Sequence, residues 1–183
     1  MQKELLEEKL KDPLYAVRHS AAHVLAQAVL DMFPEAKLGV GPVIDFGFYY
    51  DFQLPRALVP EDLEILEGKM KAIIAEAQSF ERMEEEPERV IEFLKKAEQP
   101  FKVELATEFA EAGQVITFYK NVNAAGETKF IDLCRGGHLE STKGIGAFKL
   151  NKIAAAYWRG NEKNPQLQRI YGLCFDTQEE LDA

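Results

Sequence analysis

Hydrophobic and polar positions follow two different periods along this chain, and the change of period divides it into segments. Within residues 14–33, apolar side chains recur every three to four positions, which predicts a helix bounded by Pro13 and Pro34. Only Arg18 and Asp31 are charged inside this segment. A helix so poor in charge is covered around most of its circumference, so we expect it to lie at the centre of the fold.

Later segments mix helical and strand periods. A second helix is predicted from Pro60 to about Ser79, and a third from near Pro87 to just before Pro100. Apolar runs between turn residues predict strands, with a turn at 123–126, over residues 40–44, 46–52, 101–106, 115–121, 129–134, 147–158 and 167–175. The order predicts an α+β fold, in which a mostly antiparallel sheet packs with the long central helix and further helices.

Three segments are expected along the chain. Residues 1–13 are charged and are predicted to form a helical lead-in or linker. Residues 14–175 are predicted to form one domain. Residues 176–183 read as the start of a helix capped by Asp176 or Thr177. Because that helix is cut off after one or two turns, we expect the natural chain to continue.

Composition narrows the functional classes. The chain has 183 residues, of which 46% are hydrophobic, and no apolar run approaches the length of a membrane helix. The net charge of −9 argues against non-specific binding of nucleic acid. Two cysteines and a charged start without an apolar signal core predict a reducing, cytoplasmic setting.

All three histidines and one of the two cysteines fall into two pairs with the same spacing. His19 and His23 share one face of the central helix, nearly opposite its apolar stripe, while Cys134 and His138 flank two glycines. We expect the pairs to form the two walls of a pocket. Their nitrogen and sulfur atoms suit zinc, with four protein ligands or with three and a water. Without metal, a histidine would serve as general base on water while a cysteine or lysine holds it; the plainer interpretation is two unrelated buried pairs.

Neighbouring residues carry weaker signals. Asp132 lies two positions before Cys134 and so on the same face of a strand, where it would orient a histidine or bind an amine, or else be a solvated strand-end carboxylate. On pattern alone Lys102 is a surface lysine, and Cys174 lies in an apolar run typical of a core.

A basic strip covers residues 139–170. It has a net charge of +4 in an acidic chain and includes Tyr157 and Trp158. Such a strip suits a phosphate backbone with an unstacked end, although an ordinary solvated sheet face has the same composition. Its cations are Lys143, Lys149, Lys152, Arg159, Lys163 and Arg169.

Five motifs together resemble one known family. In order they are R-H-S-A-A-H-V-L, G-P-V-I-D-F-G-F-Y-Y-D-F, D-L-C-R-G-G-H, A-A-A-Y-W-R-G and L-Q-R-I-Y-G. Over roughly residues 14–183 the chain closely resembles the editing domain of bacterial-type threonyl-tRNA synthetase. The H-x-x-x-H and C-x-x-x-H pair is shared with alanyl-tRNA synthetase and free-standing alanyl-tRNA deacylases, whereas G-F-Y-Y-D and A-Y-W-R-G point to the threonyl family.

The resemblance implies hydrolysis of the ester of mischarged seryl-tRNA(Thr). It implies that Gly41 and Tyr50 line the substrate pocket, and it places in the hydrolytic site His19, His23, Lys102, Asp132, Cys134 and His138. Gly137 departs from the family, where proline is common. On metal the resemblance is ambivalent: either no cofactor is required, or zinc is held by His19, His23, Cys134 and His138.

The resemblance also implies partners. These are the acceptor end of tRNA(Thr) carrying serine, and a homodimeric parent synthetase whose missing catalytic domain would use ATP and Mg²⁺. From the basic strip itself, we expect Lys149 and Arg159 to guide the tRNA end toward the pocket. Since a pocket discriminates one methyl group only about 10- to 200-fold, a threonine enzyme benefits from a second sieve. Two alternatives remain open: a free-standing alanyl-type trans-editing deacylase, and a non-catalytic tRNA-binding appendage.

Overall fold

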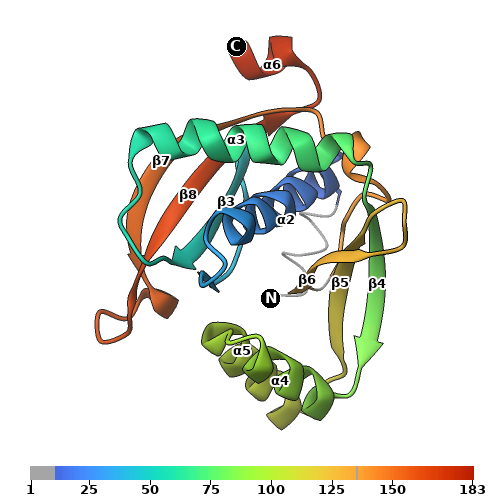
Figure 1. Cartoon of the computed structure of the whole chain (residues 1–183), viewed down its shortest axis with the longest axis vertical. Helices are drawn as coiled ribbons and strands as arrows, with labels where there is room; N and C mark the ends of the chain where they lie inside the picture. Colours follow the sequence, from blue (N-terminus) through green and yellow to red (C-terminus); the bar gives the residue numbers. More distant parts are fainter. Residues whose placement is uncertain (1–10, 135) are drawn as a thin grey trace.

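Helix α2 (Tyr15–Met32) forms the centre of the molecule, as the sequence predicts (Figure 1). The computed structural model describes residues 11–134 and 136–183. Buried residues occur on every side of α2, from Val17 and Ala21 to His23 and Val29. The small alanine side chains let sheets and helices approach the helix closely from several directions.

The larger sheet lies against one side of α2. Its strand order is β1-β3-β8-β7, with β2 also paired to β3, and all pairs are antiparallel. The inner face places Phe48, Tyr50 and Phe52 in the main core, where helix α3 (Pro60–Ala75) also packs. The strands are β1 (Lys37–Leu38), β2 (Val43–Ile44), β3 (Gly47–Gln53), β7 (Ala147–Tyr157) and β8 (Gln166–Phe175).

A second antiparallel sheet stands on another side of α2 (Figure 1). It consists of β4 (Ser79–Glu85), β5 (Ile116–Val122) and β6 (Thr128–Leu133), in that order. Between β4 and β5 the chain forms a helical hairpin of α4 (Pro87–Lys96) and α5 (Pro100–Glu111). The α+β class with antiparallel sheets is therefore confirmed, but the described residues form two sheets rather than one.

The predicted second helix is too long. Helix α3 ends at Ala75, and Ala77 adopts φ 53°, the left-handed conformation that ends many helices. Residues 79–85 then form β4, an edge strand that the sequence analysis missed. Its two apolar residues, Phe80 and Met83, lie three positions apart, so no alternation marks the strand in the sequence. The charged side chains between and after them protect an edge strand from pairing with other chains.

The predicted strand at 101–106 is wrong, because this segment belongs to helix α5. Pro100 occupies the first turn of the helix, where its missing N–H costs nothing. Phe101, Leu105 and Phe109 recur every four residues, and this helical period extends beyond the short alternation that suggested a strand. Lys102, predicted to lie on a surface strand, therefore lies on a helix and is buried.

The remaining predicted elements are present with small shifts. The chain turns at Asn123, whose carbonyl accepts the N–H of Gly126, and Thr177 caps the final helix α6 (Gln178–Asp182). Single-turn 3-10 helices occupy Thr142–Gly144 and Trp158–Gly160. The lead-in predicted for residues 1–13 lies almost wholly outside the described residues. Among the described helices, none combines the length and apolar character needed to cross a bilayer.

Candidate active site

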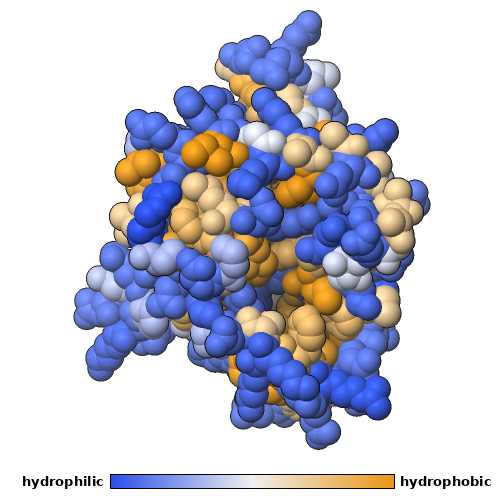
Figure 2. Space-filling view, viewed as in Figure 1, coloured by the Kyte–Doolittle hydropathy of each residue, from blue (hydrophilic) through white to orange (hydrophobic). Residues whose placement is uncertain are grey.

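A cavity of about 390 Å³ opens where the two sheets, α2 and α5 meet. It brings together seven of the residues named from the sequence: His19, His23, Gly41, Tyr50, Lys102, Asp132 and Cys134. An apolar rim surrounds this polar group and includes Val40, Leu105, Phe109 and Val115. In Figure 2, apolar residues gather in a hollow above the α4–α5 hairpin.

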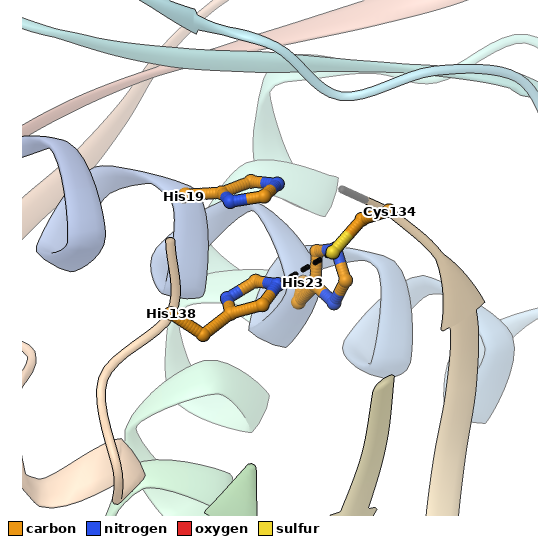
Figure 3. Close-up of side chains that lie close together, drawn as sticks. All are labelled: His19, His23, Cys134 and His138. Atoms are coloured by element: carbon orange, nitrogen blue, oxygen red, sulfur yellow. Dashed lines mark hydrogen bonds between the residues drawn. The ribbon is translucent and has the colours of Figure 1, made fainter. Parts of the chain in front are cut away.

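His19 and His23 project from α2 toward the same space, one helical turn apart (Figure 3). Their exposed fractions are 8% and 2%, so neither faces open water. Tyr15, one turn earlier, extends the row and lies 5.5 Å from His19 between ring centroids. Tyr15 is not among the site residues predicted from the sequence, although it continues the same four-residue spacing.

Cys134 and His138 approach from the loop after β6. Cys134 Sγ lies 3.2 Å from Nε2 of His138, and the four candidate ligand atoms lie within 4.8 Å of one another. The loop turns through Gly136 and Gly137, with φ 115° and 88°. Proline fixes φ near −65°, so the proline common in the family at position 137 would require a different loop conformation.

Burial keeps the three histidines of the site uncharged. Desolvation lowers the pKa of His19 to about 4, and it lowers the pKa values of His23 and His138 as well. Desolvation, helped by the nearby Asp132 carboxylate, raises the pKa of the Cys134 thiol to about 12. At neutral pH the site therefore holds neutral imidazoles and a protonated thiol, which suits general-base chemistry rather than a thiolate nucleophile.

Asp132 is the centre of a second polar group. Lys102 Nζ lies 2.8 Å from its Oδ1, and the Tyr50 hydroxyl donates to its Oδ2 at 2.5 Å. His23 Nε2 lies 3.6 Å from the same Oδ2. Desolvation is also the main reason that the pKa of Tyr50 is raised well above its ordinary value, so the phenol stays a donor.

Gly41 fits against the ring of Tyr50. A β-carbon at position 41 would lie 2.2 Å from Cδ2 of Tyr50, closer than any real contact. Glycine at this position therefore allows the loop after β1 to approach the ring that holds Asp132.

The histidine and cysteine group also fits a zinc ion. Imidazole nitrogen and thiolate sulfur are both usual zinc ligands, and Nδ1 of both His19 and His23 is buried without a hydrogen-bond partner in the described part of the chain. Binding of zinc would require Cys134 to lose its proton, which a bound cation favours.

Lys149 and Arg159 lie apart from the cavity. Lys149 Nζ is 3.7 Å from Glu67 Oε1, while Arg159 pairs with Glu104 and Glu108. Their carboxylate partners come from helices α3 and α5, so the local charge is more balanced than the basic strip alone suggests. A tRNA contact at these residues stays a prediction.

Known proteins match this chain over segments that contain the residues of the site. The family model for the second additional domain of threonyl and alanyl tRNA synthetases matches residues 116–171, which include Asp132, Cys134 and His138. The threonine–tRNA ligase of Bifidobacterium longum (strain DJO10A) is 48% identical over 185 residues, covering 94% of this chain and 27% of that protein. The ligase of Mycobacterium sp. (strain KMS) is 50% identical over 184 residues, covering 94% and 26%.

A third relative matches this chain over a similar share of its length. The threonine–tRNA ligase of Acetivibrio thermocellus is 48% identical over 168 residues, covering 92% of this chain and 25% of that protein. The chain thus spans about a quarter of the length of these relatives.

Proposed function

We propose that this chain, an editing-type domain of the threonyl-tRNA synthetase family, hydrolyses the ester of seryl-tRNA(Thr). The observation that carries the proposal is the cavity itself, where a neutral His19, a protonated Cys134 and the Lys102–Asp132 pair line one space. Ester hydrolysis needs an aligned water, a base to take its proton and a group to hold the substrate amine. These side chains would align the water, accept its proton and bind the amine.

His19 is the proposed general base. Its low pKa leaves an unprotonated ring nitrogen at neutral pH, and it lies at the cavity wall rather than behind it. The base takes a proton from water as the water oxygen attacks the ester carbonyl carbon. The ester bond to the ribose oxygen then breaks, and the protonated His19 returns its proton to that oxygen as it leaves.

Lys102 and Cys134 position the water or the ester, and Asp132 binds the substrate amine. Asp132 is already oriented by Lys102 and Tyr50. A carboxylate has about four acceptor sites, so two existing partners leave room for an incoming ammonium group. Zinc, when held by three of the residues His19, His23, Cys134 and His138, would keep one position open and would supply Lewis-acid activation there.

Selection of serine over threonine is assigned to the size of the polar end of the cavity. Threonine carries one further methyl group, which a rigid wall excludes by steric overlap. In the intact protein this reaction would correct mischarging by a ligase domain, and the proposed partner is the acceptor end of tRNA(Thr) in the cytoplasm.

The test is hydrolysis of seryl-tRNA(Thr) and threonyl-tRNA(Thr) by the full chain. We expect serine to be released much faster than threonine. We expect His19→Ala and Cys134→Ala each to lower the rate of serine release by about 10²-fold or more. Cys174→Ala is the matched control, because this thiol is buried in the main core and does not line the cavity. Circular dichroism checks that each variant is folded.

Two outcomes would replace the proposal. Preference for alanyl-tRNA(Ala) would favour the alanyl-type deacylase, and release of serine no faster than in buffer would favour a tRNA-binding appendage.

A further inference from the structure

His138 differs from the other three members of the histidine and cysteine group, because it does not line the cavity. Its ring is stacked between Phe80, at 4.8 Å and 4°, and His19, at 4.1 Å and 15°. The edge of Tyr119 meets it from the side, with centroids 4.6 Å apart. The ring is thus held behind His19, where it contacts other side chains rather than substrate.

Both ring nitrogens of His138 have partners. Nδ1 lies 3.1 Å from Oγ of Ser20, and Nε2 lies 3.2 Å from Sγ of Cys134. Ser20 is fully buried on α2, between the two histidines of that helix. A chain of hydrogen bonds therefore runs from Ser20 through His138 to Cys134, and Cys134 lines the cavity.

The other partner of Ser20 favours one direction for this series of hydrogen bonds, because a hydroxyl that accepted from both partners would have no acceptor for its own hydrogen among the described residues. The backbone N–H of Leu139 donates to Ser20 Oγ at 3.0 Å. An oxygen that accepts one hydrogen still has its own hydroxyl hydrogen to donate, and in the described residues its remaining partner is His138 Nδ1. A neutral imidazole has one N–H, so an accepting Nδ1 places the hydrogen on Nε2, which then donates to Cys134 Sγ.

We propose that Ser20 is a positioning residue of this site, holding His138 as its Nε2–H tautomer so that the Cys134 thiol hydrogen points into the cavity. Since Sγ accepts a hydrogen from His138, the thiol hydrogen is free to donate to a ligand oxygen. The link to catalysis rests on the proposed hydrolytic function, whereas the tautomer is a property of the folded chain alone. Binding of zinc through Nε2 would require the opposite tautomer, with Nδ1–H donating to Ser20.

The tautomer is measured by long-range ¹H–¹⁵N correlation NMR on the full chain with labelled histidine. The sample is first shown by elemental analysis to hold no metal. We expect wild-type His138 to carry its hydrogen on Nε2, and we expect Ser20→Ala to shift the population toward Nδ1–H. A wild-type Nδ1–H tautomer would overturn the proposal, and so would an unchanged tautomer in Ser20→Ala.

Thr142→Val is the matched control. Thr142 is also fully buried, and its hydroxyl accepts the N–H of Gln78 and donates to the carbonyl of Ile74, away from the cavity. Its loss should leave the tautomer of His138 unchanged. If Ser20→Ala fails to fold, the wild-type spectrum alone still decides the direction of the hydrogen bonds.

Kinetics add a second readout. Ser20→Ala should lower kcat for seryl-tRNA(Thr) about tenfold and leave KM within about twofold, because one hydrogen bond is lost without removing a substrate contact. Thr142→Val should leave kcat unchanged. An inactive wild type would refute the proposed function, while the spectrum would still test the role of Ser20.

Discussion

Lys102 Nζ lies 2.8 Å from Asp132 Oδ1, and only 5% and 3% of these two side chains are exposed. The pair joins helix α5 to strand β6, and both side chains line the cavity. The Tyr50 hydroxyl donates a hydrogen bond to the other oxygen of Asp132. The orientation of the Asp132 carboxylate therefore depends on three separate elements, α5, β3 and β6.

Removing the lysine should destabilise the protein strongly. In Lys102→Met the Asp132 carboxylate stays buried without its cation, which typically costs about 3–5 kcal/mol of unfolding free energy. Lys96→Met is the control, because Lys96 pairs with Glu92 at the exposed surface and its loss should change stability by less than about 1 kcal/mol. Urea unfolding measures both, and equal losses would contradict the structural role of the buried pair.

A single methyl group at position 41 should displace the Tyr50 ring and so lower the activity of the site. In Gly41→Ala the new β-carbon overlaps the Tyr50 ring, so the ring and its hydrogen bond to Asp132 must move. We expect hydrolysis to fall at least about tenfold. Gly68→Ala is the matched control: nothing lies within 4 Å of a β-carbon there, and alanine in helix α3 should stabilise the protein by about 0.5–1 kcal/mol.

The buried imidazoles should make stability depend on pH. In the unfolded chain each histidine binds a proton below about pH 6.5, whereas in the folded chain the pKa of His19 is lowered to about 4 and those of His23 and His138 are also lowered. The unfolded state thus binds more protons, so the stabilisation is complete above pH 6.5 and is lost as pH falls toward the folded pKa.

Urea unfolding of the metal-free protein at pH 7 and pH 5.5 tests this expectation. Each histidine should contribute a loss of about 1 kcal/mol over that interval. His138→Gln should show a smaller loss than wild type, by about the share of one histidine. Equal stability at the two pH values would contradict the lowered pKa values, because the histidines would then take up protons in the folded chain as they do in the unfolded chain.

Metal removal separates the two chemical versions of the proposed mechanism. We expect protein stripped by a chelator, and shown to be metal-free by elemental analysis, to keep hydrolysing seryl-tRNA(Thr). Added zinc should bind through the histidine and cysteine group, and Cys134→Ser should weaken that binding while Cys174→Ser leaves it unchanged. Activity that disappears on stripping and returns with zinc would instead make the metal obligatory.

Two cations outside the cavity are predicted to guide tRNA. Changing both Lys149 and Arg159 to glutamine should weaken tRNA binding and make it less sensitive to salt, because up to two phosphate contacts are lost. The control changes Lys95 and Lys96, in the last turn of α4, to glutamine. Unchanged salt dependence would indicate that Lys149 and Arg159 serve only their carboxylate partners, Glu67, Glu104 and Glu108.

Much of the framework was determined by the sequence alone. The charge-poor helix at 14–33, the strands at 115–121, 129–134, 147–158 and 167–175, and the cavity-lining pair His19 and His23 all follow from local periodicity or spacing. These features depend on residues close together in sequence, and such residues show a period even before the chain folds. The motifs in these segments also carried the resemblance to the threonyl family.

Only the tertiary structure decided the environment of the charged residues. Lys102 is a surface lysine by pattern, but α5 turns it toward Asp132, a partner 30 positions away in the sequence. His138 likewise belongs to the site through Ser20, Phe80 and Tyr119, which come from separate elements. Burial and pKa depend on what the rest of the chain packs against a side chain, and local sequence does not contain that information.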